Sequence, residues 1–267
     1  MANKYALITG GSSGIGLATA HELAAKRYSL VLVSNQQELL RSTATEIISK
    51  YKVDCITLFV DLTDINAAKQ IFDYCNKQQL CIEILVNNAG ILVFSEVVAT
   101  AAEKLNAILQ LHINTPVMLC RLFGEQMKTR NSGYILNVSS ISSVMPYPGI
   151  SLYGPTKAFM RYFTRALRHE MKIYNVRVTC LIPGTTATAL YDPNRVNLKL
   201  ATRVGIMKTA PFVEHKATSA LLKNRAECIP GFINKLTVWF LPFVPSWVIY
   251  QLHRNTDILK KGNSALG

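Results

Sequence analysis

The chain has 267 residues, of which 49% are apolar and 17% charged, a composition typical of a globular protein with a substantial core. Lysine and arginine outnumber aspartate and glutamate by 29 to 16, which gives a formal net charge of +13. The basic residues are spread along the chain without a run of five or six, so we expect no dedicated nucleic-acid arm and no nucleic-acid partner. No segment has the roughly 18–20 uninterrupted apolar residues that a membrane span needs.

The six cysteines (55, 75, 81, 120, 180 and 228) form no CxxC motif, and none has a histidine at metal-ligand spacing. Most lie in apolar runs, where cysteine behaves as a small buried hydrophobe. The amino-terminal stretch MANKYALITGG also lacks the long apolar segment of a signal peptide. We therefore expect a reduced, cytoplasmic protein without a metal site.

Short apolar runs alternate with helical patterns along the chain. The runs predict buried strands at 5–9, 29–33, 55–60, 82–86, 133–138 and 176–182. The longer patterns between them predict helices, the clearest at 14–27, 64–79 and 152–174. This alternation predicts an α/β fold, a Rossmann-type doubly wound parallel sheet with helices on both faces. Because no linker or repeat interrupts it, we expect a single domain over residues 1–267.

The last third of the chain differs in composition. We predict that residues 186–225 are helical and polar. The domain core is predicted to run from about residue 4 to about residue 230. An apolar, amphipathic helical extension is predicted from about 231 to 262, and it holds both tryptophans of the chain.

The run ITGGSSGIG closes the first predicted strand and opens the first predicted helix. Its glycines, Gly10, Gly14 and Gly16, let backbone N–H groups approach a phosphate at the helix N-terminus, where the helix dipole favours negative charge. Ser12, Ser13 and Ile15 complete the candidate cofactor loop. The alternative is a glycine-rich turn that serves only to pack the helix on the strand.

Two further motifs follow strand ends, where ligands bind in such sheets. VDLTD contains Asp61 and Leu62 after the third strand, with Asp61 placed to accept a hydrogen bond from an adenine amine. VNNAG, with Asn88, Ala89 and Gly90, follows the fourth strand. Each motif is a weak signal alone, since asparagine and glycine also mark ordinary turns.

SLYGPTKAF places the phenol of Tyr153 and the amine of Lys157 four positions apart, one turn apart on one helix face. Ser140 lies thirteen residues before Tyr153, after the fifth strand. A phenol with a pKa of about 10 exchanges protons poorly at neutral pH, and a nearby ammonium lowers that pKa. The lowered phenol suits general acid/base catalysis on a hydroxyl or a carbonyl, with a serine to polarise the same oxygen.

Between residues 4 and 190 the chain resembles the short-chain dehydrogenases/reductases. It contains, in the order found in that family, TGxxxGxG, NNAG, an asparagine upstream of the catalytic motif, a serine and YxxxK. The resemblance implies that Tyr153 is the acid/base and that Ser140 contacts the substrate oxygen. It implies that Lys157 lowers the tyrosine pKa and binds the nicotinamide ribose, so that Tyr153 and Lys157 also face the cofactor. Asn114, in LHINTP, matches the asparagine that holds a water in the proton relay.

The resemblance extends to the cofactor. PGTTAT matches the family's PGxxxT, so Pro183, Gly184 and Thr188 are expected near the nicotinamide. Family members that prefer NAD usually carry an acidic residue after the second strand, and NADP enzymes often carry an arginine. Here Ser34 and Asn35 occupy that stretch, so no carboxylate would repel a 2′-phosphate. We therefore favour NADP(H) over NAD(H), although the usual guanidinium clamp is missing.

The tail AECIPGFINKL resembles that of lipid- and ketoacyl-reductase-like members of the family. The apolar stretch 236–250 is interrupted by two prolines and is too short to span a bilayer. Its tryptophans and the lysines and arginine around it fit an interfacial helix pair that makes a peripheral membrane contact. The alternative is that these aromatic residues cover the substrate pocket or a subunit contact.

These features predict an NADP(H)-dependent oxidoreductase that interconverts a ketone and a secondary alcohol, with a hydrophobic long-chain 3-keto lipid as substrate. A hydroxysteroid-type dehydrogenase is the alternative within the same class, and a non-catalytic dinucleotide-sensing scaffold is the alternative of another class. The resemblance implies a homodimer or homotetramer packed through the helices around 112–130 and 152–174. We interpret the face of Arg161, Arg165 and Arg168 as solvated or intersubunit.

Overall fold

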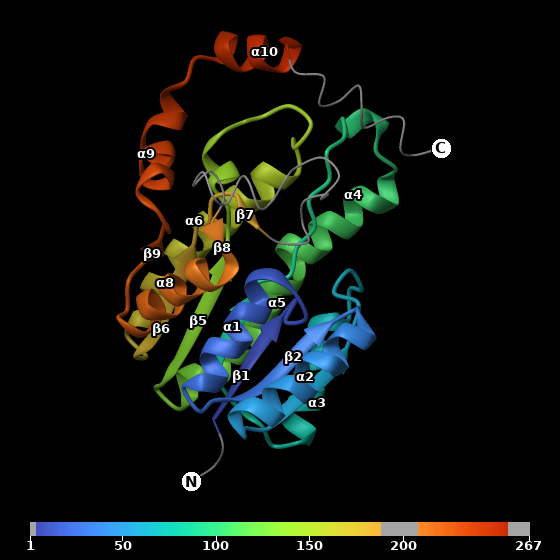
Figure 1. The fold of residues 1–267 in the computed structure, drawn as a ribbon, viewed down its shortest axis with the longest axis vertical. Helices are drawn as coiled ribbons and strands as arrows, with labels where there is room; N and C mark the ends of the chain where they lie inside the picture. The colour runs from blue at the N-terminus through green and yellow to red at the C-terminus, as the bar shows by residue number, and fades with distance from the viewer. Residues whose placement is uncertain (1–3, 188–207, 256–267) are drawn as a thin grey trace.

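The structure, a computed structural model, describes residues 4–187 and 208–255 (Figure 1). Its centre is a seven-stranded sheet in the order β3-β2-β1-β4-β5-β6-β9, in which every neighbouring pair is parallel. The order changes direction between β1 and β4, as in a Rossmann-type fold. The predicted single-domain α/β fold is confirmed. The strands are β1 (Lys4–Thr9), β2 (Ser29–Ser34), β3 (Cys55–Phe59), β4 (Cys81–Asn87), β5 (Gly133–Val138), β6 (Val176–Leu181) and β9 (Glu227–Cys228).

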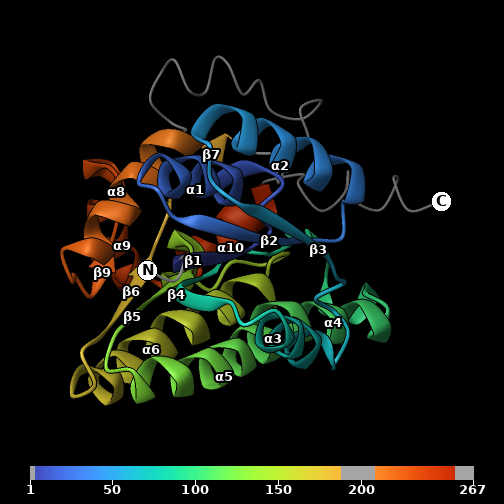
Figure 2. The same ribbon diagram turned by 90° about the horizontal axis from the view of Figure 1, so that it is seen from below.

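Helices cover both faces of the sheet (Figure 2). One layer consists of α1 (Gly14–Ala25), α2 (Gln37–Tyr51) and α8 (Ala210–Leu222). The other consists of α3 (Ala67–Lys77), α5 (Thr115–Thr129) and α6 (Tyr153–Lys172). The central strands are buried on both faces, which explains their continuous apolar sequences. On β1, for example, Leu7 contributes to the core under α3 and α5, and Ile8 to the core under α1 and α8.

The predicted helical segment at 186–225 is only partly helical. Residues 186–187 (β7) and 208–209 (β8) instead pair as short parallel strands, and α8 begins directly after β8. Pro211 lies in the first turn of α8, where a missing backbone N–H is tolerated. Residues 188–207 lie outside the part of the chain that the structure describes.

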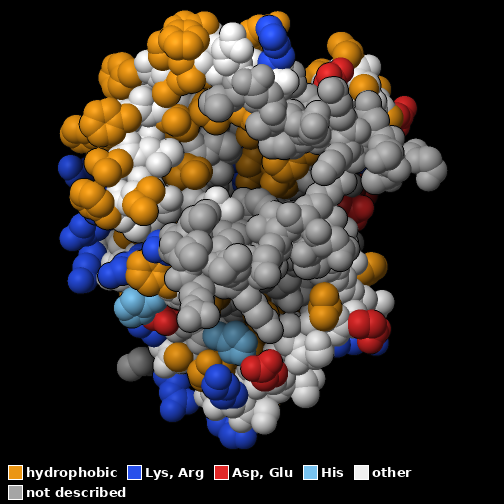
Figure 3. Space-filling model, turned by 45° about the horizontal axis from the view of Figure 1, so that its top comes forward, with side chains coloured by type: hydrophobic (Ala, Val, Ile, Leu, Met, Phe, Trp, Pro, Cys, Tyr) orange, Lys and Arg blue, Asp and Glu red, His pale blue; other side chains and the backbone are white. Residues whose placement is uncertain are grey.

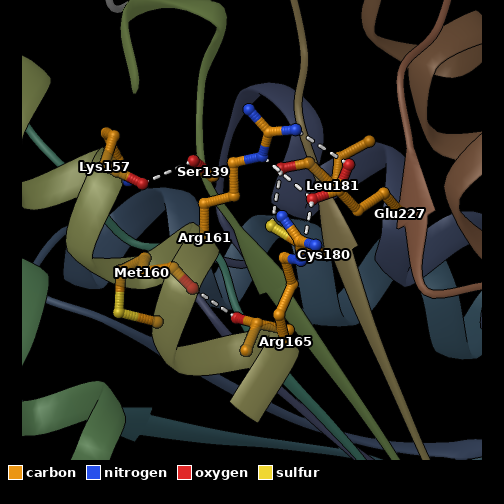
Figure 4. Close-up of polar contacts among 9 residues, drawn as sticks. Ser139, Lys157, Met160, Arg161, Arg165, Cys180, Leu181 and Glu227 are labelled. Atoms are coloured by element: carbon orange, nitrogen blue, oxygen red, sulfur yellow. Dashed lines mark hydrogen bonds and ion pairs between the residues drawn. The ribbon is translucent and has the colours of Figure 1, made fainter. Parts of the chain in front are cut away.

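Arg161 and Arg165 of α6 contact Glu227 of the same chain (Figure 4), and Arg165, with 55% of its side chain exposed, fits the solvated part of the expected solvated or intersubunit face. The Arg161 guanidinium donates two hydrogen bonds to Glu227 on β9, at 2.9 and 3.0 Å, in a bidentate ion pair. Arg165 Nε lies 4.0 Å from the same carboxylate, and Arg168 donates to the backbone oxygens of Val178 and Asn224. These contacts attach the last strand of the sheet, and with it the start of the extension, to α6.

The extension consists of α9 (Phe232–Phe240), a short 3-10 turn η4 (Leu241–Phe243) and α10 (Ser246–Asn255). It lies at the end of the molecule opposite the amino terminus (Figure 1). Across residues 4–187 and 208–255, the structure contains no helix with the length and apolar content that crossing a bilayer requires.

Candidate active site

A cavity of about 300 Å³ lies at the carboxyl ends of the central strands, where the strand order changes direction. Ligands bind at this position in open α/β sheets. Its lining comes from the loops after β1, β2, β4, β5 and β6 and from the start of α6. The lining residues are Gly10, Ser13, Gly14, Ile15, Gln36, Asn88, Ala89, Gly90, Ile91, Val138, Ser139, Ser140, Tyr153, Lys157, Pro183, Gly184 and Thr186.

The glycine-rich loop between β1 and α1 forms a cradle that side chains would fill. Gly10 and Gly14 have φ values of +66° and +56°, in the left-handed region that favours glycine. A Cβ on Gly16 would collide with the carbonyl oxygen of Gly10 and with the Asn88 side chain. The loop thus brings backbone N–H groups to a helix N-terminus at the cavity, and its residues fit a cofactor phosphate.

Asn88 connects this loop to the end of β4. Its amide donates to the backbone oxygens of Thr9 and Gly10, at 3.0 and 3.3 Å. The hydroxyl of Thr9 accepts hydrogen bonds from the backbone N–H groups of Asn88 and Ala89, at 2.9 and 3.1 Å. Asn88 therefore holds the glycine-rich loop in place, and Asn88 also lines the cavity.

The loop after β2 contributes Gln36, which the sequence interpretation did not select. The hydroxyls of Ser12 and Ser34 are buried and lie 2.9 Å apart, so each has a partner within the protein. Asn35 is exposed and does not line the cavity, whereas Gln36 does. The backbone N–H of Gln36 donates to Ser34 Oγ at 3.1 Å, which holds the turn in place.

Lys157 is a buried amine, with 5% of its surface exposed. Its Nζ donates to the backbone oxygen of Val138 at 3.1 Å, and its own carbonyl accepts from Ser139 Oγ at 2.6 Å (Figure 4). Burial lowers the pKa of Lys157 from about 10.5 to about 8, because desolvation disfavours the charged form. The amine is thus held rigidly and titrates close to neutral pH.

Tyr153 and Ser140 line the same cavity as Lys157. Tyr153 is the first residue of α6, so the proline at position 155 falls in the first helical turn, where it is accepted. The Lys157 Nζ lies 5.7 Å from the centre of the Tyr153 ring. Ser140 caps the short 3-10 turn η3 (Ile141–Val144), and its Oγ accepts from the Ser142 backbone N–H at 3.2 Å. The arrangement brings a phenol, a hydroxyl and an amine together at one cavity.

His112 is a buried residue beside this group that the sequence interpretation missed. Its ring packs edge-on against Tyr153 with the ring centres 5.6 Å apart. Nε2 accepts from the Ile91 backbone N–H at 3.0 Å, and Nδ1 lies 3.0 Å from Thr156 Oγ1. Because Thr156 Oγ1 donates to the Tyr153 carbonyl, it is available to accept from Nδ1–H. Burial, assisted by the nearby Lys157 charge, holds the pKa of His112 well below its usual value, so the ring is neutral.

The structure does not bring every predicted site residue to the cavity. The side chain of Asn114 is exposed and donates to Gln110 Oε1 at 3.0 Å, one turn back in the same helix. Asp61 is exposed, and its carboxylate accepts from the Thr63 backbone and hydroxyl. Leu62 is buried under Thr115, which donates to its carbonyl at 2.9 Å. Thr188 lies outside the described residues.

A second, narrower cavity adjoins the first at Ile91 and Tyr153, which line both. Its other lining residues come from the segment after β4, from α4 (Ala102–Leu109) and from the loop before α6, among them Val93, Leu105, Ile108 and Leu152. Tyr153 therefore borders both cavities, of which the second, at about 10 Å³, has room for about one water molecule. In residues 4–187 and 208–255 there is no cluster of three or more potential metal ligands.

The sequence and the fold are similar to those of known proteins. The family model described as "short chain dehydrogenase" matches residues 4–198. A very-long-chain 3-oxoacyl-CoA reductase from Bos taurus is 31% identical over 257 residues, 93% of this chain and 78% of the relative. The Danio rerio very-long-chain 3-oxoacyl-CoA reductase-A is 34% identical over 70% of this chain, but only 59% of that relative is spanned. Human 17-beta-hydroxysteroid dehydrogenase type 3 is 29% identical over 93% of this chain and 77% of its own length.

Solved structures share the fold. One from a study of 7beta-hydroxysteroid dehydrogenase stereoselectivity superimposes with a TM-score of 0.80, at 25% identity, over 89% of this chain and 91% of the other. A short-chain dehydrogenase from Sphingobium yanoikuyae gives a TM-score of 0.79 at 22% identity, over 95% and 96% of the two chains.

Proposed function

The chain belongs to the short-chain dehydrogenases/reductases, which are NAD(P)-dependent oxidoreductases acting on CH–OH and C=O groups, and we propose that it reduces a hydrophobic ketone with NADPH. One observation carries this proposal. Ser140, Tyr153 and Lys157 line one cavity, at which a phenol, a hydroxyl and an amine meet. A carbonyl in this cavity would have a proton donor beside it.

In this proposal the Tyr153 hydroxyl gives its proton to the carbonyl oxygen, and the Ser140 hydroxyl donates a hydrogen bond to the same oxygen. The charged Lys157 amine favours the phenolate that remains, which then regains a proton from solvent. A bound nicotinamide cofactor supplies the hydride to the carbonyl carbon. Proton and hydride together convert the ketone into a secondary alcohol.

The cofactor preference rests on charge around the β2 loop. Ser34, Asn35 and Gln36 are all uncharged, so no carboxylate in the loop opposes a 2′-phosphate. The Gln36 side chain, at the cavity, is available to donate a hydrogen bond. We favour NADP(H) over NAD(H) on this basis, with the glycine loop, Asn88, Ala89 and Gly90 holding the rest of the cofactor.

The substrate class rests on the relatives. Several relatives are named very-long-chain 3-oxoacyl-CoA reductases, and this favours a long-chain 3-keto lipid. The relative named 17-beta-hydroxysteroid dehydrogenase type 3 keeps a steroid ketone as the second candidate. A non-catalytic dinucleotide-sensing scaffold is disfavoured, because it would have no need for the three polar side chains at the cavity.

We extend the proposal to the assembly and the location of the enzyme. Exposed apolar side chains on α5 and α6, Met118, Phe159 and Tyr162, support packing of a homodimer or homotetramer through these helices. All six cysteines are free, in keeping with a reduced cytoplasmic protein. Its hydrophobic substrates would place the enzyme at the periphery of a membrane.

The test is NADPH and NADH oxidation by the purified full-length chain against ketones graded by chain length and ring size. We expect a higher kcat/KM with NADPH than with NADH, and a kcat/KM that rises with chain length among 3-keto compounds. A preference for fused-ring ketones would favour the steroid alternative. Cofactor binding without turnover of any ketone would favour the scaffold and contradict the proposal.

A further inference from the structure

The extension presents large apolar side chains to solvent. Phe232, Leu236, Trp239, Phe240, Phe243 and Trp247 form what we call the docking face, and Trp239, Phe243 and Trp247 are 74%, 81% and 69% exposed. On α9 these residues recur at helical spacing along one side. Figure 3 shows hydrophobic side chains gathered on this part of the surface, with Lys and Arg side chains along its border. Monomeric soluble proteins rarely expose such a contiguous patch without a partner for it.

The opposite side of the extension is anchored in the fold, so the exposed side is held in place. Val238 on α9 is buried against Cys180 and Ile182, and Ile141 and Val144 of η3 pack on the same cluster. Ile249 on α10 is also buried. The docking face is therefore the outer surface of a helix whose inner surface packs against the strand and turn that carry the active site.

The charge around the docking face indicates what it contacts. The sequence from residue 228 to residue 256 contains no aspartate or glutamate, while Lys235 and Arg254 are exposed beside the aromatic side chains. Aromatic side chains next to cations are typical of helices that lie in a membrane interface. We propose that the docking face binds the surface of an anionic lipid bilayer, with α9 and α10 lying in the interface.

Two other occupants match this surface less well. A second copy of this chain seated on this face would bring the same Lys235 and Arg254 to the contact, and these like charges oppose association there. An acidic protein would match the charge, but the face is formed by aromatic and aliphatic side chains, with few donors for a carboxylate. A bilayer with anionic headgroups offers apolar acyl chains to the aromatic side chains and negative charge to Lys235 and Arg254.

Docking would bring the active-site opening close to the lipid. Asn234 of α9 lies against Gly184, which lines the active-site cavity. A hydrophobic ketone would then leave the bilayer close to the cavity that Tyr153 lines. This consequence rests on the proposed function, whereas docking itself does not.

Tryptophan fluorescence can report on docking, because both tryptophans of the chain belong to the docking face. The full-length protein is titrated with phosphatidylcholine vesicles with and without phosphatidylserine, and tryptophan emission and co-sedimentation are recorded. We expect a blue shift and co-sedimentation with the anionic vesicles, both weakened by high salt because the headgroup attraction is screened. Brominated lipids should quench the emission.

Phe243→Glu places a charge on the docking face and should weaken vesicle binding about tenfold or more. Ile173→Glu is the matched control, because Ile173 is equally exposed, at 78%, but follows the far end of α6. Equal binding by the two variants, or no blue shift with any vesicle, would overturn the proposal. A concentration-dependent blue shift in the absence of lipid would assign the face to a second copy instead. Activity of both variants on a water-soluble ketone tests the proposed function separately.

Discussion

At the scale of single residues, the buried amine of Lys157 links electrostatics to the proposed chemistry. Burial lowers its pKa to about 8, so the amine is mainly charged at neutral pH and loses its charge just above. The folded protein thus releases this proton more readily than the unfolded chain, and stability rises with pH between about 8 and 10.5 from this group. Activity should instead fall as the pH rises above about 8, because the proposed role of Lys157 requires its positive charge.

We predict that kcat/KM for NADPH in ketone reduction falls above about pH 8. A pH–rate profile of the wild type checks this. Lys157→Arg supplies a positive charge that does not titrate in this range, so the alkaline limb should move to higher pH even if the variant is slower. An unchanged alkaline limb in Lys157→Arg would assign the titration to another group and contradict the role of Lys157.

At the scale of elements, the π-helical turn η2 (Gln110–Asn114) decides which side chain reaches Tyr153. A π-helical turn has wider hydrogen bonding than an α-helix, which rotates the side chains relative to the ordinary helical period. Here it directs His112 inward to Tyr153 and Thr156, and leaves Asn114 exposed beside Gln110. His112 therefore joins η2 to the first turn of α6 and orients the phenol.

We predict that His112→Leu lowers kcat for ketone reduction by about tenfold to a hundredfold while the KM for NADPH changes little. The physical reason is a displaced Tyr153 ring, since the variant loses both hydrogen bonds of the imidazole. His112→Asn should recover part of kcat, because an amide can still accept from Ile91 or donate to Thr156.

Asn114→Ala is the matched comparison, two residues along the same turn. We expect its kcat to remain near the wild-type value, because the side chain is exposed and donates its hydrogen bond to Gln110, away from the cavity lining. If Asn114→Ala lost activity and His112→Leu did not, the proton relay expected from the family resemblance would pass through Asn114 after all. Circular dichroism of each variant separates these effects from unfolding.

At the scale of the whole molecule, the sequence predicted the sheet well because its signals are local. Apolar runs such as 29–33 and 133–138 have no polar alternation, and the structure buries them on both faces. That Ser140, Tyr153 and Lys157 meet at one cavity could be predicted, because ordered motifs place Ser140 after the fifth strand and one helical turn separates Tyr153 from Lys157. The glycine loop was predictable for the same reason, since Gly10 and Gly16 adopt a backbone path that side chains exclude.

Features that depend on tertiary packing could not be predicted in the same way. The residue types around η2 do not indicate the π-helical turn that brings His112, and not Asn114, to Tyr153. Gln36 lines the cavity, where it is held by hydrogen bonds with Ser12 and Ser34 that depend on how the two loops pack. In the extension, the apolar sequence could not separate the inward Val238 and Ile249 from the exposed tryptophans, because this depends on where the helices attach to the sheet.

The central claim is that Tyr153 transfers the proton in ketone reduction. The direct measurement is the NADPH-dependent reduction of a turned-over ketone by Tyr153→Phe, with Tyr162→Phe as the control, because Tyr162 lies on the same helix and is 68% exposed. We predict that Tyr153→Phe loses at least about a hundredfold in kcat, since general acid catalysis contributes on that order, while NADPH binding and Tyr162→Phe stay near wild type. Wild-type turnover by Tyr153→Phe would contradict the account.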